Sequence, residues 1–152
     1  SHMSIFDQVN EGIKNAMKNK EEATLRALRG VKSALLLAKT EKGAADELSE
    51  EKEIQVLQKL VKQRKESLEI YTTQNRPELA VVEAEEIAVI EKFLPKQMDE
   101  ATLRTELQNI IAAVGAAGPQ DMGKVMALLK PKLTGRADMA KVSSLIKGKI
   151  SV

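Results

Sequence analysis

The chain has 152 residues, of which 43% are hydrophobic and 30% are charged, and its formal net charge is +2. This length allows one globular domain or two small ones, and the charged fraction is too high for a membrane-embedded protein. There is no Cys, and the single histidine, His2, lies in residues 1–3, which are typical of an expression-tag remnant. Without native Cys or His, the sequence excludes Cys nucleophiles, Ser-His triads, disulfides, and zinc or haem sites built on these residues.

Apolar residues recur at spacings of three and four along the whole chain, which predicts an all-α fold. We expect an N-terminal domain, residues 4–95, with four helices. Their predicted ranges and boundary signals are 4–18 with a capping box at Ser4, 20–41 ended by Gly43, 49–75 capped by Ser49, and 77–94 opened by Pro77 and closed by Pro95. At ~1.5 Å per residue the third helix is roughly 40 Å long, which is more than a compact bundle of this size needs.

Residues 95–98 form the predicted junction to a small C-terminal three-helix bundle, residues 99–152. Its helix signals, in chain order, are a cap at Asp99, stops at Gly115 and Gly118, a start at Pro119, a weak point at Lys130-Pro131, a turn at Gly135 and a cap at Asp138. Gly148 disfavours the final turn of the last helix.

Charged residues interrupt the apolar faces of two predicted helices. Arg64 shares a face with apolar residues in the third helix, and Glu83 and Glu86 lie on or beside the apolar face of the fourth. A charge on a buried face needs a partner, so we predict an ion pair from Arg64 to Glu83 or Glu86 that fixes helix register. A catalytic role for the carboxylates is the alternative, but the sequence supplies neither a substrate pocket nor an electrophile.

Other charges in the N-terminal domain have structural interpretations. Carboxylates at positions 46, 47, 50, 51 and 53 precede or open the third helix, whose dipole favours negative charge there. The basic triplets 26-29-32 and 59-62-65 are interpreted as exposed faces, with partners four residues away such as Glu22 for Arg26.

Positive charge is concentrated at the C-terminus. Residues 1–95 carry 15 Lys and Arg against 17 Asp and Glu, whereas residues 119–152 carry 7 against 2. The two acids, Asp121 and Asp138, lie near predicted helix starts, so the nearby cations lack acidic partners. They are Lys124, Lys130, Lys132, Arg136, Lys141, Lys147 and Lys149. This pattern predicts a polyanion-binding module, and a merely soluble basic surface is the alternative.

Several strings in this region resemble one family. Asp121-Met122-Gly123-Lys124-Val125-Met126, Leu129-Lys130-Pro131-Lys132-Leu133 and Gly135-Arg136-Ala137-Asp138 resemble the C-terminal motif of the GatB/YqeY family. Lys62-Gln63-Arg64, Arg76-Pro77-Glu78-Leu79-Ala80 and Phe93-Leu94-Pro95-Lys96-Gln97-Met98 extend the resemblance to nearly the whole chain. The chain is similar to free-standing YqeY-like proteins and to the tail domain of GatB, a subunit of the aminoacyl-tRNA amidotransferase.

The resemblance implies contact with tRNA, because the GatB tail domain contacts the tRNA body. It also implies the family label of carbon-nitrogen ligase with glutamine as amido-N-donor, although the catalytic cradle of GatB and a serine-based amidase have no counterpart here. We therefore expect a tRNA-binding accessory protein that is non-catalytic by itself, with no catalytic residues, no metal and no cofactor. The alternatives are an adaptor for an amidotransferase or an aminoacyl-tRNA synthetase, and an amidotransferase-like activity.

In the expected complex, the segment from Lys124 to Lys132 is presented to the RNA phosphate backbone together with Arg136 and Lys141, and Lys62 extends this footprint. Gly123 and Gly135 permit close backbone approach. No apolar run nears the ~20 residues that span a bilayer, and no signal peptide is evident, so we expect a cytoplasmic protein without a membrane partner.

Overall fold

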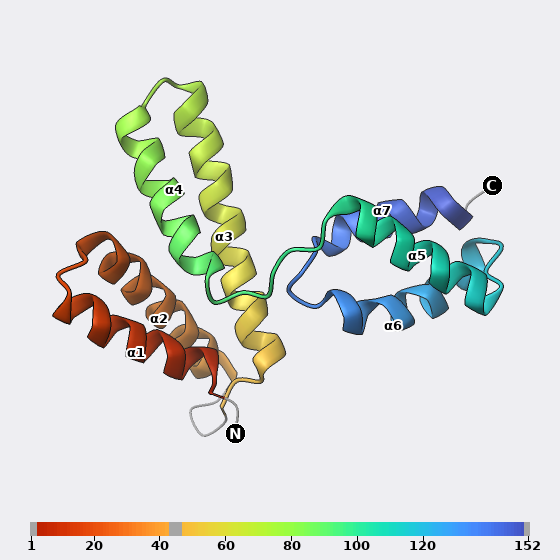
Figure 1. Cartoon of the computed structure of the whole chain (residues 1–152), viewed down its shortest axis with the longest axis horizontal. Helices are drawn as coiled ribbons and strands as arrows, with labels where there is room; N and C mark the ends of the chain where they lie inside the picture. The colour runs from red at the N-terminus through yellow and green to blue at the C-terminus, as the bar shows by residue number, and fades with distance from the viewer. Residues whose placement is uncertain (1–2, 43–46, 151–152) are drawn as a thin grey trace. The chain divides into compact units, whose positions relative to one another are not determined.

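Figure 1 shows the computed structural model of the chain, which describes residues 3–42 and 47–150. All regular elements in this part are helices, which confirms the all-α prediction. They are α1 (Ile5–Lys18), α2 (Glu22–Lys42), α3 (Glu50–Thr73), α4 (Pro77–Glu91), α5 (Glu100–Val114), the 3-10 turn η1 (Pro119–Asp121), α6 (Met122–Leu133) and α7 (Met139–Ile150). The expected remnant at positions 1 and 2 and the helix-ending residues 43–46 lie outside the described ranges. Within those ranges, no helix has the length and apolarity needed to cross a membrane.

The chain divides after Pro95 into two compact units, residues 1–95 and 96–152, which we call unit 1 and unit 2. In unit 1, α1 packs on α2 and α3 packs on α4, while α2 also contacts α3 and α4. All four helices contribute to one apolar core. Its fully buried members include Val9, Leu28, Val31, Leu35, Leu57 and Ile90, each at most 1% exposed.

A buried carboxylate joins α1 to α3. Glu53 is only 3% exposed, and its side chain accepts hydrogen bonds from the backbone nitrogens of Ile5 and Phe6, at 3.3 and 2.8 Å. The first N–H groups of a helix have no partner within the helix, and Glu53 supplies one. The interpretation of Glu53 as one of several carboxylates that merely favour the dipole of α3 is therefore incomplete: its hydrogen bonds cap a different helix, α1. Ser4 completes this cap by accepting from the nitrogen of Asp7 at 3.1 Å.

The core of unit 2 is built from three residues of each helix. They are Leu103, Leu107 and Ile110 of α5, Val125, Leu129 and Leu133 of α6, and Val142, Ile146 and Ile150 of α7. The predicted junction is tied to this unit, because the nitrogen of Met98 donates to the carbonyl of Arg136 at 2.9 Å and Gln97 Nε2 donates to the carbonyl of Gly135 at 3.0 Å.

Two details of the C-terminal helices differ from the sequence prediction. Pro119 opens the short turn η1, and α6 itself begins at Met122. The helix then continues past Pro131 to Leu133, since a proline so close to the end removes only one late hydrogen bond. Gly148 is likewise contained in α7, which extends to Ile150 because Val142, Ile146 and Ile150 anchor it in the core.

Candidate nucleic-acid interface

Three of the predicted RNA-binding lysines lie on α6, where they point in different directions. Lys124, Lys130 and Lys132 are all exposed. Successive residues of an α-helix are turned by about 100°, so Lys130 and Lys132 differ by about 200°. The segment from Lys124 to Lys132 therefore does not form one continuous basic face.

Two of the predicted lysines are paired with carboxylates of α5. Lys132 Nζ lies 3.1 Å from Glu106 Oε2, and Lys141 Nζ lies 3.5 Å from Glu100 Oε1. The prediction that the basic set faces only the two aspartates is therefore wrong. Its cause is tertiary: α5 brings acidic residues that are distant in sequence onto the flanks of α6 and α7. All four side chains are at least 32% exposed, so these are surface pairs of small net energy.

The turn between α6 and α7 uses Arg136 and Gly135 internally. Arg136 Nε donates to the carbonyl of Lys96 at 3.0 Å. Gly135 is buried and has a φ of 76°, so its conformational freedom serves the turn. We expected this glycine to permit a close approach of RNA, and its burial contradicts that expectation. Gly123 is exposed, and a Cβ added there would meet no atom within 4 Å. Of the two glycines, Gly123 is the one that is open to a ligand.

Four exposed lysines of α6 and α7 have no ion-pair partner within 4.0 Å among the described residues. They are Lys124 and Lys130 on α6 and Lys147 and Lys149 on α7. The nearby carboxylate of Asp121 is engaged elsewhere, because it accepts hydrogen bonds from the backbone nitrogens of Ala117 and Gly118. These two bonds lower the pKa of Asp121, and the charge of Lys124 lowers it further.

The remaining predicted contact, Lys62, is an exposed residue of α3 and belongs to unit 1. Lys62 therefore belongs to a different unit from the other predicted RNA contacts.

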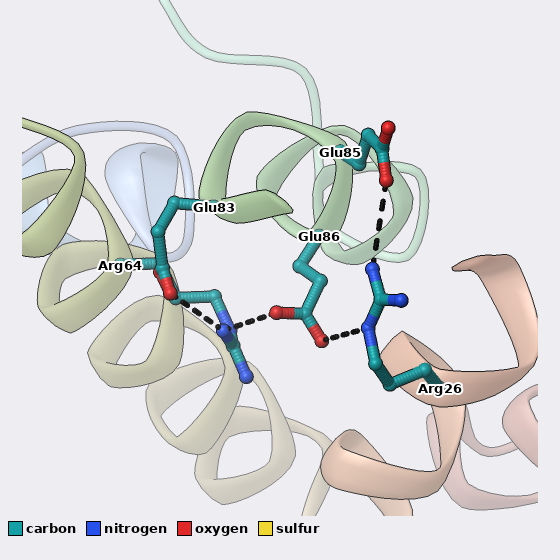
Figure 2. Close-up of polar contacts among 5 residues, drawn as sticks. All are labelled: Arg26, Arg64, Glu83, Glu85 and Glu86. Carbon is teal, nitrogen blue, oxygen red and sulfur yellow. Dashed lines mark hydrogen bonds and ion pairs between the residues drawn. The ribbon is translucent and has the colours of Figure 1, made fainter. Parts of the chain in front are cut away.

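A second group of charges lies inside unit 1, between α2, α3 and α4. Arg64 Nη1 donates to Glu83 Oε1 at 3.3 Å and also to Glu86 Oε2 (Figure 2). Arg64 thus contacts both carboxylates that the sequence offers as its partners. The side chain of Glu86 is only 7% exposed, and that of Arg64 is 26% exposed. The Nε of Arg64 and Oε2 of Glu83 are buried without a hydrogen-bond partner.

Sequence spacing did not identify Arg26 as a member of this cluster. Arg26 Nε lies 3.5 Å from Glu86 Oε1, and its Nη2 lies 3.5 Å from Glu85 Oε2. Figure 2 shows Glu86 between the two arginines. We interpreted Arg26 as an exposed residue paired with Glu22 on its own helix, whereas the structure pairs it with α4. The nearest signal in the sequence is Gly30, one turn after Arg26, where a Cβ would lie 3.9 Å from Arg64 Nη2.

Comparison with known proteins agrees with the motifs of this chain. The family model described as Yqey-like protein matches residues 6–150. The chain belongs to the YqeY-like family. This membership covers both units and relates the chain to the tail domain of GatB. No curated protein matches the chain.

The charged groups of this YqeY-like chain have two different environments. In unit 1, the buried carboxylate of Glu53 accepts hydrogen bonds from backbone N–H groups, and that of Glu86 forms ion pairs with two arginines. The described part of the chain contains no cluster of three or more Asp, Glu or His able to hold a metal ion. In unit 2 the available groups are exposed ammonium donors, whose ordinary ligand is an anion such as phosphate.

Proposed function

We propose that the protein is a cytoplasmic, non-catalytic accessory protein that binds tRNA through unit 2. The observation that carries this proposal is the excess of positive charge in residues 119–152, 7 Lys and Arg against 2 Asp and Glu, which includes four exposed lysines of α6 and α7 without ion-pair partners among the described residues. Membership of the YqeY-like family supports it. Lysines bind a phosphate backbone by charge, and such contacts position an RNA without reading its bases. Recognition then depends on the shape of the folded RNA.

Salt dependence provides the sharpest test, because binding of a lysine to a phosphate releases a counterion. We would measure filter binding of total tRNA to the full chain at several salt concentrations. The slope of log affinity against log salt is negative, and the double variant Lys124→Ala and Lys130→Ala should make it shallower. Its magnitude should fall by about 1.4 to 1.8, at about 0.7 to 0.9 for each contact.

The matched control removes two exposed lysines from α1, with Lys14→Ala and Lys18→Ala. It changes the net charge by the same amount, so a general charge effect would appear in both variants. Equal slopes for the wild type and the α6 variant would contradict the proposal. The slope of the α1 variant should stay at the wild-type value.

Two further experiments with the wild-type chain test the two other functional classes. Partners that remain bound in a pull-down after nuclease treatment would favour an adaptor for an amidotransferase or synthetase. Conversion of Glu-tRNA that requires glutamine and ATP would favour an amidotransferase-like enzyme, and the proposal expects none from the purified chain.

A further inference from the structure

Helices α6 and α7 repeat one sequence pattern. Residues 123–133 read GKVMALLKPKL and residues 140–150 read AKVSSLIKGKI, so five of eleven positions are identical at an offset of 17. The three lysines of α6, at positions 124, 130 and 132, correspond to those of α7 at positions 141, 147 and 149.

The repeat is also structural. The buried residues of α6, at positions 125, 129 and 133, correspond to buried residues 142, 146 and 150 of α7. All six lysines are exposed, and so are the small residues at 123, 127 and 131 and their counterparts at 140, 144 and 148. Each helix therefore buries the same side and presents the same side to solvent.

The centre of each exposed side is a small residue between two lysines. On α6, Ala127 lies three residues from both Lys124 and Lys130; on α7, Ser144 lies three residues from both Lys141 and Lys147. Residues three apart are neighbours on a helix surface, so the two lysines of each helix flank a strip of small residues. An RNA phosphate backbone can approach the helix closely along this strip.

The two helices run in opposite directions, joined by residues 134–138 (Figure 1). Each contributes one pair of flanking lysines, and only Lys141 among these four is paired, with Glu100 at the surface. Helix α5 does not have a small residue between two lysines, because its charged residues are Glu100, Arg104 and Glu106.

We propose that α7 is a second backbone-binding helix equivalent to α6, and that unit 2 uses the two helices to contact the two strands of a base-paired RNA stem. This inference rests on the proposed function and adds the ligand class and the residues Ser144 and Lys147. Because each helix carries its own lysine pair, unit 2 can contact two phosphate backbones, which a stem provides, whereas unpaired RNA offers only one. Double-stranded RNA is recognised mainly through its shape and its backbone, which suits contacts of this kind.

The test uses the full chain with an RNA hairpin and an unpaired RNA of equal length. Lys130→Ala and Lys147→Ala should each weaken hairpin binding by about 3- to 10-fold at low salt, and each should lower the salt slope by about 0.9. Ala127→Gln and Ser144→Gln, which cover the strips without changing charge, should weaken hairpin binding to similar extents. Ala112→Gln, at an exposed position of α5, is the matched control and should leave the affinity unchanged.

The outcomes separate this inference from the proposed function. If the α6 variants weaken binding while Lys147→Ala and Ser144→Gln bind as the wild type does, the equivalence of α7 is refuted and the RNA-binding function stands. If wild type prefers unpaired RNA over the hairpin, the ligand class is refuted. If the wild type binds neither RNA nor tRNA, the proposed function itself fails. Circular dichroism of each variant verifies that the helices are intact.

Discussion

The ion-pair cluster of unit 1 predicts an ordered series of stability losses, of which Arg64→Met is the largest. Removing this guanidinium leaves Glu83 without its hydrogen-bond donor and leaves Glu86 with Arg26 alone, at 3.5 Å. Breaking a fully buried pair costs about 3–5 kcal/mol. Because the Arg64 side chain is 26% exposed and Glu86 keeps a second arginine, we expect a loss of about 2 kcal/mol.

The carboxylate side of the cluster should respond unequally. Glu83→Met should cost less than Glu86→Met, because one buried oxygen of Glu83 already lacks a partner while Glu86 pairs with two arginines. Lys65→Met is the matched control on α3: its pair with Glu91 spans 3.8 Å between side chains 59% and 41% exposed. We expect the control to change the free energy of unfolding by less than about 0.5 kcal/mol.

The only tyrosine of the chain, Tyr71, lies on α3 and there is no Trp, so tyrosine fluorescence reports the unfolding of unit 1. Urea titrations followed by this signal measure the free energy of unfolding of unit 1 even when unit 2 unfolds separately. An Arg64→Met free energy within about 0.5 kcal/mol of the wild type would refute the argument that the buried carboxylates depend on this arginine.

Three further results are expected. Glu53→Gln should destabilise unit 1 by about 1–3 kcal/mol in the same titration, because the amide replaces an acceptor oxygen with a donor that faces the backbone N–H groups of α1; an unchanged midpoint would contradict this. Glu106→Gln should strengthen tRNA binding about 2- to 3-fold at low salt by releasing Lys132, and this gain should vanish in a Lys132→Ala background. The lowered pKa of Asp121 means that its stabilisation of unit 2 is present above the ordinary carboxyl pKa and is lost as pH falls through the folded value, so Asp121→Asn should flatten the acid limb of a thermal-melting profile followed by circular dichroism.

The helices of this chain were predictable because their signals are local. Ser49 and Asp99 lie at predicted caps and accept hydrogen bonds from the nitrogens of Lys52 and Thr102. The same reasoning pointed to Arg64 as a charge that needs a partner on another helix, because a single charged residue on an apolar stripe is visible at helical spacing.

The missed features are contacts between distant segments. Glu53 and Arg26 have sequence neighbours that explain them adequately on their own helices, yet each acts on a different helix of unit 1. Lys132 looked free for the same reason, because Glu106 lies 26 residues away. Spacing rules describe one helix at a time, so they do not report which flank faces a neighbouring helix.

The two units differ in charge balance and in the pairing of their central charges. In unit 1 the central arginines are held by three carboxylates of α4, so their charge is neutralised within the fold. In unit 2, α5 supplies only two glutamates to the flanks of α6 and α7, and four exposed lysines of these two helices are left without ion pairs among the described residues. A phosphate backbone that contacts these lysines need not displace an internal carboxylate, and each contact gains the full effect of counterion release. Exposed lysines without ion pairs, such as Lys14 and Lys18, also occur in unit 1, but residues 1–95 carry more acidic than basic residues. The excess of positive charge in residues 119–152, 7 Lys and Arg against 2 Asp and Glu, therefore favours unit 2 as the site of polyanion binding.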